Sequence, residues 1–162
     1  MSPSTPDFPY FYPEEAKQLL DYQGKQLQSV SQFFWENKAD NNQTLSLIME
    51  LSFLFEGGSQ LTFHAPEDRS GLAVGQMNRV VEELKIQESG ISDLRLREAT
   101  EDENDNWEPF LNETLVAIEL VTMSPGIYRN EQMIFDFGFT KVLISRPLDG
   151  IEVEELVNED ED

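Results

Sequence analysis

The chain has 162 residues, with 32 Asp and Glu against 11 Lys and Arg, a formal net charge of −21, and no cysteine. The lack of cysteine excludes disulfides, thiolate metal sites and thiol nucleophiles, and the negative charge disfavours direct binding to nucleic acid, whose phosphates it repels. The chain is long enough for one folded core, and at 39% hydrophobic residues it is not disordered by composition, but no stretch approaches the roughly 20 apolar residues of a membrane span.

The N-terminal residues 1–12 are expected to form an extended arm, because three prolines interrupt any regular element there. This arm has neither a basic start nor an apolar stretch, so we expect no secretory signal and a cytoplasmic protein. Pro13 begins a predicted helix that reaches about Gln23, with acidic residues in its first turn and Gly24 after its end.

Two strands are predicted next, over residues 27–35 and 45–55. Apolar and polar residues alternate along the second strand, which is typical of a sheet with one buried face. Two glycines then close a hairpin. A three-residue loop pairs Phe55 with Leu61 and keeps the apolar side chains on one face, whereas a two-residue loop would separate them.

Between the two halves of the chain, Met77, Val80, Val81 and Leu84 recur at helical spacing, which predicts a helix. Residues 80, 84 and 86 also alternate well enough to leave a strand open.

A further strand is predicted over residues 114–123 and a second hairpin near residue 138. The second hairpin is predicted to pair Phe135 with Val142 and Met133 with Ile144, with apolar residues on both faces.

The second half of the chain repeats the order of the first, strand, glycine turn, strand, proline-led loop, at Phe55-Glu56-Gly57-Gly58 and again at Phe135-Asp136-Phe137-Gly138. We therefore predict an α+β fold of two related units, each a helix with antiparallel strands, forming a mainly antiparallel sheet. The units span about 13–74 and 75–153 of a single domain, residues 13–153, followed by an acidic tail, 154–162. The predicted core is Leu47, Met49, Leu51, Phe53, Phe55, Leu61, Phe63, Val116, Ile118, Met133, Phe135, Val142 and Ile144.

Few residues support catalysis. The sequence lacks a phosphate-binding glycine motif and HExxH, and its one histidine, His64, ends a predicted strand, where a structural role is favoured. Glu56 and Asp136 hold matching places beside the hairpin loops, where acidic residues suit turns. We predict no catalytic residue and no cofactor.

Residues 102–113 partly resemble an EF-hand calcium loop, with Asp102, Asn104 and Asn106 at the first, third and fifth positions and Glu113 at the twelfth. Trp107 stands where that loop needs glycine, and a strand rather than a helix follows. A solvated acidic loop is therefore favoured, and no metal ligand is assigned.

The same acidic loop leads directly into two aromatic residues. Acidic side chains steer a basic partner by charge, and rigid rings provide anchoring area. The alternative, which the pattern favours, is that the rings cap the core at the start of a strand. The candidate partner-binding residues are Glu101, Asp102, Glu103, Asp105, Trp107 and Phe110.

These features predict a non-catalytic, acidic binding or inhibitor-like protein that engages a basic protein surface. Bacterial immunity and inhibitor proteins include small acidic α+β domains of this kind, an analogy of class without a shared motif. A carboxylate- or metal-dependent enzyme and a structural, self-assembling subunit stay open as alternatives. A homodimer is compatible with the sequence, whereas direct contact with nucleic acid or a membrane is not expected.

Overall fold

A computed structural model of the chain describes residues 9–40, 43–66, 69–90, 94–99, 107–147 and 150–156. Within these ranges the chain forms two α-helices, α1 (Pro13–Leu20) and α2 (Arg79–Ser89), and antiparallel strands. The strands are β1 (Leu27–Asp40), β2 (Gln43–Phe55), β3 (Gln60–His64), β4 (Ala73–Val74), β5 (Leu94–Glu98), β6 (Ala117–Ser124), β7 (Ile127–Asp136), β8 (Lys141–Ser145) and β9 (Glu152–Leu156).

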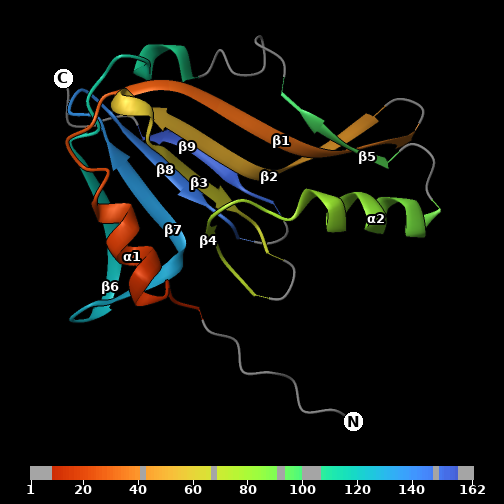
Figure 1. Ribbon diagram of the computed structural model, residues 1–162, viewed down its shortest axis with the longest axis horizontal. Helices are drawn as coiled ribbons and strands as arrows, with labels where there is room; N and C mark the ends of the chain where they lie inside the picture. The colour runs from red at the N-terminus through yellow and green to blue at the C-terminus, as the bar shows by residue number, and fades with distance from the viewer. Residues whose placement is uncertain are drawn as a thin grey trace.

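The strands form two sheets, with the orders β4-β3-β2-β1-β5 and β6-β7-β8-β9. Every pair of neighbouring strands is antiparallel. The predicted α+β class with mainly antiparallel strands is therefore confirmed, although the strands divide between two sheets. Figure 1 shows α1 beside β6 and β7 at one end of the molecule, while α2 extends from the other.

Both helices follow from local sequence. Pro13 opens α1, and the Glu15 side chain accepts the backbone N–H of Tyr12, which caps the first turn. The helix ends at Leu20, three residues before the predicted end, and a turn continues to Gly24. At the start of α2, Asn78 Oδ1 accepts the N–H of Val81, so this stretch is a helix and not a strand.

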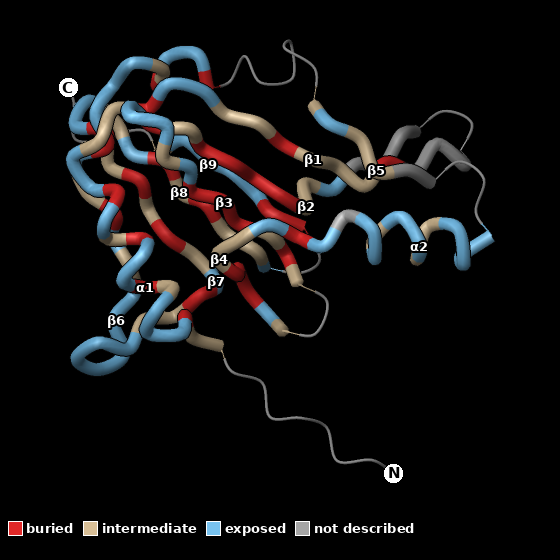
Figure 2. The backbone as a smooth tube through the Cα atoms, in the orientation of Figure 1, coloured by how far each residue is buried: buried red, intermediate tan, exposed pale blue. Residues whose placement is uncertain are grey.

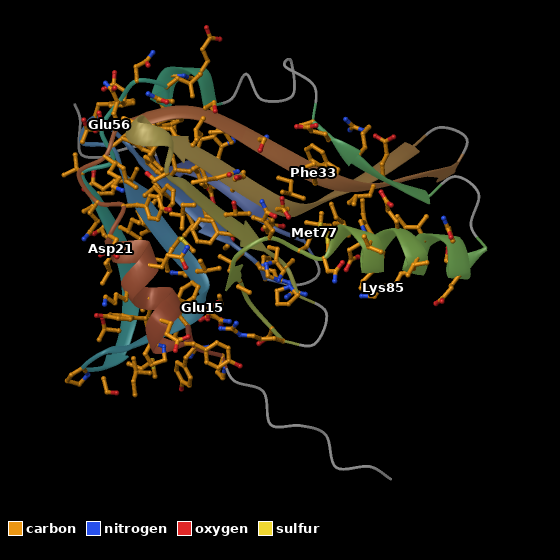
Figure 3. All side chains as sticks on the ribbon, in the orientation of Figure 1. Glu15, Asp21, Phe33, Glu56, Met77 and Lys85 are labelled. Carbon is orange, nitrogen blue, oxygen red and sulfur yellow. The ribbon has the colours of Figure 1, made fainter. Side chains whose placement is uncertain are left out.

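The apolar side of α2 is not buried as the spacing implied. Met77, just before the helix, is buried, but Val80 is 67% exposed and Leu84 is 50% exposed. Figure 2 shows α2 as the least buried helix, and Figure 3 places Met77 where the chain enters it and Lys85 along it. The residues after Met77 therefore add little to the core.

The first hairpin has a longer loop than predicted. Phe53 pairs with Leu61 and Leu51 with Phe63, so Phe55 lies beyond the β2–β3 ladder, and the predicted pairing of Phe55 with Leu61 is wrong. A short 3-10 turn at Glu56–Gly58 fills the loop, and the N–H of Phe55 donates to the Ser59 carbonyl. A shift of two residues leaves every side chain on its expected face, which is why the apolar pattern did not exclude it.

A β-bulge in β2 corrects the prediction of a single apolar face. Phe33 of β1 pairs with Glu50 and Phe34 with Ile48, so Met49 has no partner on β1. The alternation of faces along β2 reverses at this residue. Leu47, predicted to lie in the core, consequently points to the other face and is 42% exposed.

Two of the other predicted core residues differ from the prediction. Met49 is only partly buried against the core, and Val116, which precedes β6, is 54% exposed. The rest of the predicted core is buried. The second hairpin has the predicted register, with Phe135 opposite Val142 and Met133 opposite Ile144. Its strands β7 and β8 are both central in their sheet, as their two apolar faces indicated.

One hydrophobic core joins the two sheets. The ring of Phe135 in β7 lies 5.0 Å from that of Phe53 in β2 and 6.1 Å from that of Phe63 in β3, measured between centroids. Figure 2 shows the buried residues concentrated on the central strands. Tyr22, after α1, closes one side of this core, and its hydroxyl donates to the Gln60 carbonyl at 2.6 Å. Burial, with a smaller contribution from Asp21, raises the pKa of this hydroxyl.

Each sheet contains a four-strand meander, β1 to β4 in one and β6 to β9 in the other. Phe53 lies between Val30 of β1 and Leu61 of β3. Phe135 lies between Ile118 of β6 and Val142 of β8. In the ladders Phe53, and not Phe55, thus holds the place that Phe135 holds in the second sheet.

The end of the predicted arm is part of the fold. Phe11 is buried, its N–H donates to the carbonyl of Tyr128, and Tyr10 forms an isolated bridge with Arg129. Neither described helix has the length and apolar character that crossing a membrane requires.

Candidate functional site

A groove of about 820 Å³ lies between the two sheets, and we call it the acidic groove. One wall belongs to β1 and β2, the other to β8 and β9, and the 3-10 turn at residues 107–110 closes one side. The lining residues are Gln32, Phe34, Ile48, Trp107, Phe110, Val142, Ser145, Ile151, Glu152, Val153, Glu154 and Glu155.

A backbone bridge between the two sheets lies among the lining residues of the groove. Ile151, immediately before β9, donates its N–H to the Ile48 carbonyl at 2.8 Å, the bridge that joins the two sheets at this point. The bulge at Met49 turns Ile48 to the inner face of the first sheet, opposite Phe34. Phe34 lies on that face through the regular alternation of β1, in which Val30 and Phe34 share one side. The bulge therefore adds an aliphatic residue beside the aromatic one.

The rim on the β9 side is acidic. Glu152, Glu154 and Glu155 are all exposed, and none of the described lining residues is Lys, Arg or His. Val153 lies opposite the buried Ile144, and Glu155 opposite the buried Val142, so Val153 and Glu155 share the inner face. The groove therefore combines an aromatic and aliphatic floor with a rim of carboxylates.

Nearby cations are already paired. Lys141 of β8 forms an ion pair with Glu119 at 3.1 Å, and the hydrogen bond from this partner, with its negative charge, raises the pKa of the lysine. Arg97 of β5 lies over the Phe34 ring and forms an ion pair with Glu36 at 2.7 Å. Neither Lys141 nor Arg97 lines the groove, so neither neutralises the carboxylates of its rim.

The predicted partner-binding residues divide into two groups. Trp107 and Phe110 line the groove but are almost wholly buried, and their rings pack on Phe53 and Phe137. They therefore cap the core, as the alternative interpretation held, and also form part of the groove wall. Glu101, Asp102, Glu103 and Asp105 lie outside the described residues, directly before Trp107 in the sequence.

The side chains weighed above as candidates for catalysis contact backbone groups. His64 Nδ1 lies 2.7 Å from the Gly75 carbonyl, and the buried Glu50 opposite it accepts the N–H of Met77, so both tie the segment before α2 to the sheet. Glu56 accepts the N–H of Gln26, and Asp136 accepts that of Gly138 within its own turn. The two hairpin acids thus make separate backbone contacts.

The calcium-loop prediction falls mostly outside the described residues. Asp102, Asn104 and Asn106 are not among them, and Glu113 is exposed just before the bridge of Thr114 to Gln26. In the described part of the chain, His, Asp and Glu side chains form no cluster that could hold a metal ion.

The sequence prediction missed β9. The last three residues of β9, Glu154 to Leu156, fall in the predicted acidic tail, and the first two residues of the strand lie at the end of the predicted domain. The available signal was the sequence Gly150-Ile151-Glu152-Val153, in which an aliphatic residue alternates with acids after a glycine.

Comparisons with protein-family models, with curated proteins and with solved structures find no match to this chain. The groove therefore has to be interpreted from its own chemistry.

Proposed function

We propose that this chain is a non-catalytic binding protein that engages a basic protein through the acidic groove. The observation that carries the proposal is the composition of the groove, in which aromatic residues form one wall and three glutamates form the rim. The half-buried ring of Phe34 offers anchoring area, and the carboxylates attract Lys and Arg. The net charge of −21 would draw a basic partner from a distance.

The acidic loop supports the same site. Four acids in residues 101–105 are joined to the groove through Trp107, whose ring forms part of the wall. These acids add to the negative charge of the chain, which attracts a basic protein. The three glutamates of the rim spread their charge along β9, which fits a basic protein better than a small cation.

Binding fits better than the enzymatic alternative. A carboxylate pair used for acid–base chemistry needs two carboxyl groups facing one substrate position. Glu56 instead accepts the backbone N–H of Gln26, and Asp136 accepts that of Gly138 in its own turn. Cytoplasmic location and homodimer formation stay predictions of the sequence.

A capture experiment tests the proposed function. The chain is immobilised and incubated with an extract of its native host at low and at high salt, alongside the variant Glu152→Gln, Glu154→Gln, Glu155→Gln. We expect a basic protein to be retained at low salt and released at high salt, and the variant to bind it roughly tenfold more weakly.

The matched control removes equal charge elsewhere, by Glu14→Gln, Glu83→Gln and Glu88→Gln on the exposed sides of the two helices. This control should bind like the wild type. Equal weakening in both variants would show that only net charge matters, and retention of no basic protein would refute the proposed function.

We also propose that the two meanders derive from a duplicated unit of one helix and four strands. The equivalent ladder positions of Phe53 and Phe135 support this, as do the hairpin partners Leu61 and Val142. In both meanders the fourth strand follows a proline-led loop, at Pro66 and Pro147. A solved crystal structure in which no rotation superposes β1–β4 on β6–β9 would contradict the duplication.

A further inference from the structure

The outer edge of β9 lacks a neighbouring strand in the described part of the chain. β9 is the last strand of its sheet and pairs only with β8 among the described strands. Such an edge presents a row of backbone N–H and C=O groups to which another strand can bond. The acidic groove lies along this edge, since the residues 152–155 line it.

The bridge at Ile151 identifies which backbone groups face the groove. The N–H of Ile151 points away from β8, because it donates to Ile48 of the other sheet. Backbone groups of alternate residues point to the same side of a strand. The N–H and C=O groups of Val153 and Glu155 therefore also point away from β8, and no other described residue bonds to them.

Charge selects the kind of strand that would bond there. Two copies of β9 pairing with each other would bring Glu152, Glu154 and Glu155 of one copy against those of the other, and like charges that face each other across strands repel. A strand with Lys or Arg would instead place opposite charges side by side. The edge is therefore matched to a basic segment of another protein rather than to a second β9.

Resting on the proposed function, we propose that the basic partner adds an extended segment as a further strand on β9. Its backbone bonds to Val153 and Glu155, its alternate side chains on the inner face enter the groove towards Phe34 and Trp107, and its outer side chains meet Glu152 and Glu154. The inner face then favours an apolar residue opposite Val153, and the outer face favours Lys or Arg beside Glu152 and Glu154. This assigns to β9 the role of recognising backbone as well as charge.

The test uses a short, labelled peptide of alternating lysine and valine, and fluorescence anisotropy to measure its affinity for the full chain. Two further peptides have the same sequence but are methylated on the backbone nitrogen of every lysine or of every valine. Each methylation pattern removes the N–H groups from one edge of the strand and leaves the side-chain charges unchanged. We expect one N-methylated peptide to bind roughly tenfold more weakly than the unmodified one, since its inward N–H groups are lost.

A substitution on the protein gives a matched pair. Val153→Pro removes one N–H from the free edge, where proline is tolerated because that nitrogen has no ladder bond to lose. Val153→Ala removes side-chain atoms but keeps the N–H. We expect Val153→Pro to weaken peptide binding roughly tenfold and Val153→Ala much less. Hydrogen exchange should also show that the peptide protects the amides of Val153 and Glu155 in the wild type.

The outcomes separate the two proposals. Binding that depends on salt and on the three glutamates, but is equal for all peptides and for both Val153 variants, would overturn strand addition and leave the proposed function standing. Failure of the glutamate variant to change binding would refute the groove as the site. The chain could instead self-associate by pairing β9 of one copy with β5, the edge strand of the other sheet, in a second copy. A concentration-dependent mass that Val153→Pro abolishes would show this, and would overturn the proposal by replacing the basic partner with a second copy.

Discussion

At the scale of single residues, Glu15 connects three parts of the molecule. Its carboxylate accepts the N–H of Tyr12 at the start of α1 and the N–H of Val74 in β4, both at 2.8 Å. It also forms an ion pair with Arg69 at 2.6 Å, and both side chains are only 12% exposed. Arg69 in turn donates to the Tyr10 carbonyl and lies over the Tyr12 ring. Figure 3 shows Glu15 on α1.

Replacing Glu15 by Gln should therefore destabilise the fold. The change leaves the guanidinium of Arg69 without its charged partner in a nearly buried position, and we expect a loss of about 3 kcal/mol in the free energy of unfolding. The neighbouring Glu14 is exposed, and Glu14→Gln should change stability by less than about 0.5 kcal/mol. Urea unfolding followed by circular dichroism measures both, and equal effects would show that Glu15 acts only through the helix dipole.

Gly71 shows a constraint of a different kind. It has a φ of +74°, and a Cβ built there would lie 2.5 Å from Oδ1 and 2.7 Å from the backbone oxygen of Asn130. Asn130 is fully buried and donates to the carbonyls of Ser70 and Leu72, so it has no room to withdraw. The close approach requires glycine, because any side chain would separate the loop from β7.

Gly71→Ala is accordingly expected to lower the free energy of unfolding by about 2 kcal/mol or more, through both the left-handed backbone and the overlap. Gly57 has a similar φ of +84° but open space around it, so Gly57→Ala reports the backbone cost alone. If thermal unfolding showed equal losses for the two variants, the contact with Asn130 would have no energetic weight.

At the scale of elements, prediction succeeded where local sequence determines structure. Pro13 with Glu15 specifies the start of α1, and the four-residue loop of the second hairpin leaves only one register that keeps Phe135 and Val142 together. The first hairpin was predicted less well, because registers two residues apart bury the same face. There the glycine-rich turn, which stabilises a longer loop, decides between them.

The bulge at Met49 limited prediction more strongly. Residues 45–55 alternate as if one flat strand buried every second residue, yet pairing with β1 skips Met49 and reverses the faces beyond it. Nothing in that stretch of sequence distinguishes a bulge from a regular strand, since the partner strand determines where pairing is interrupted. The exposed Leu47 and the inward Ile48 both follow from this one irregularity.

The acidic groove was only partly predictable for a related reason. The loop before Trp107 was recognisable because its charge and aromatic residues are adjacent in sequence. The groove itself brings together β1, β2, β8, β9 and the 107–110 turn, and such a convergence depends on how the sheets pack. The last three residues of β9 fall in the predicted tail, because a run of glutamates is typical of a solvated terminus.

At the scale of the whole molecule, the two sheets share one core. Phe53 and Phe135 are fully buried, and their ring centroids are 5.0 Å apart across the space between the sheets. A single cluster of buried residues extends from α1 through both meanders. The sheets should therefore unfold together, as one domain, and not as two independent halves.

A double-mutant cycle tests this coupling. Phe53→Leu and Phe135→Leu should each cost about 1–2 kcal/mol in the free energy of unfolding, and the double variant should differ from their sum by about 0.5 kcal/mol or more, because the rings touch. Phe11 is buried but makes no ring contact with Phe53 in the described part of the chain, so Phe11→Leu combined with Phe53→Leu should be additive.

Each variant is unfolded in urea and followed by tryptophan fluorescence and by circular dichroism. We expect the two probes to give coincident unfolding transitions and the Phe53–Phe135 pair to show coupling. Two separate transitions, of which one is unaffected by Phe135→Leu, would show that the meanders fold as separate domains.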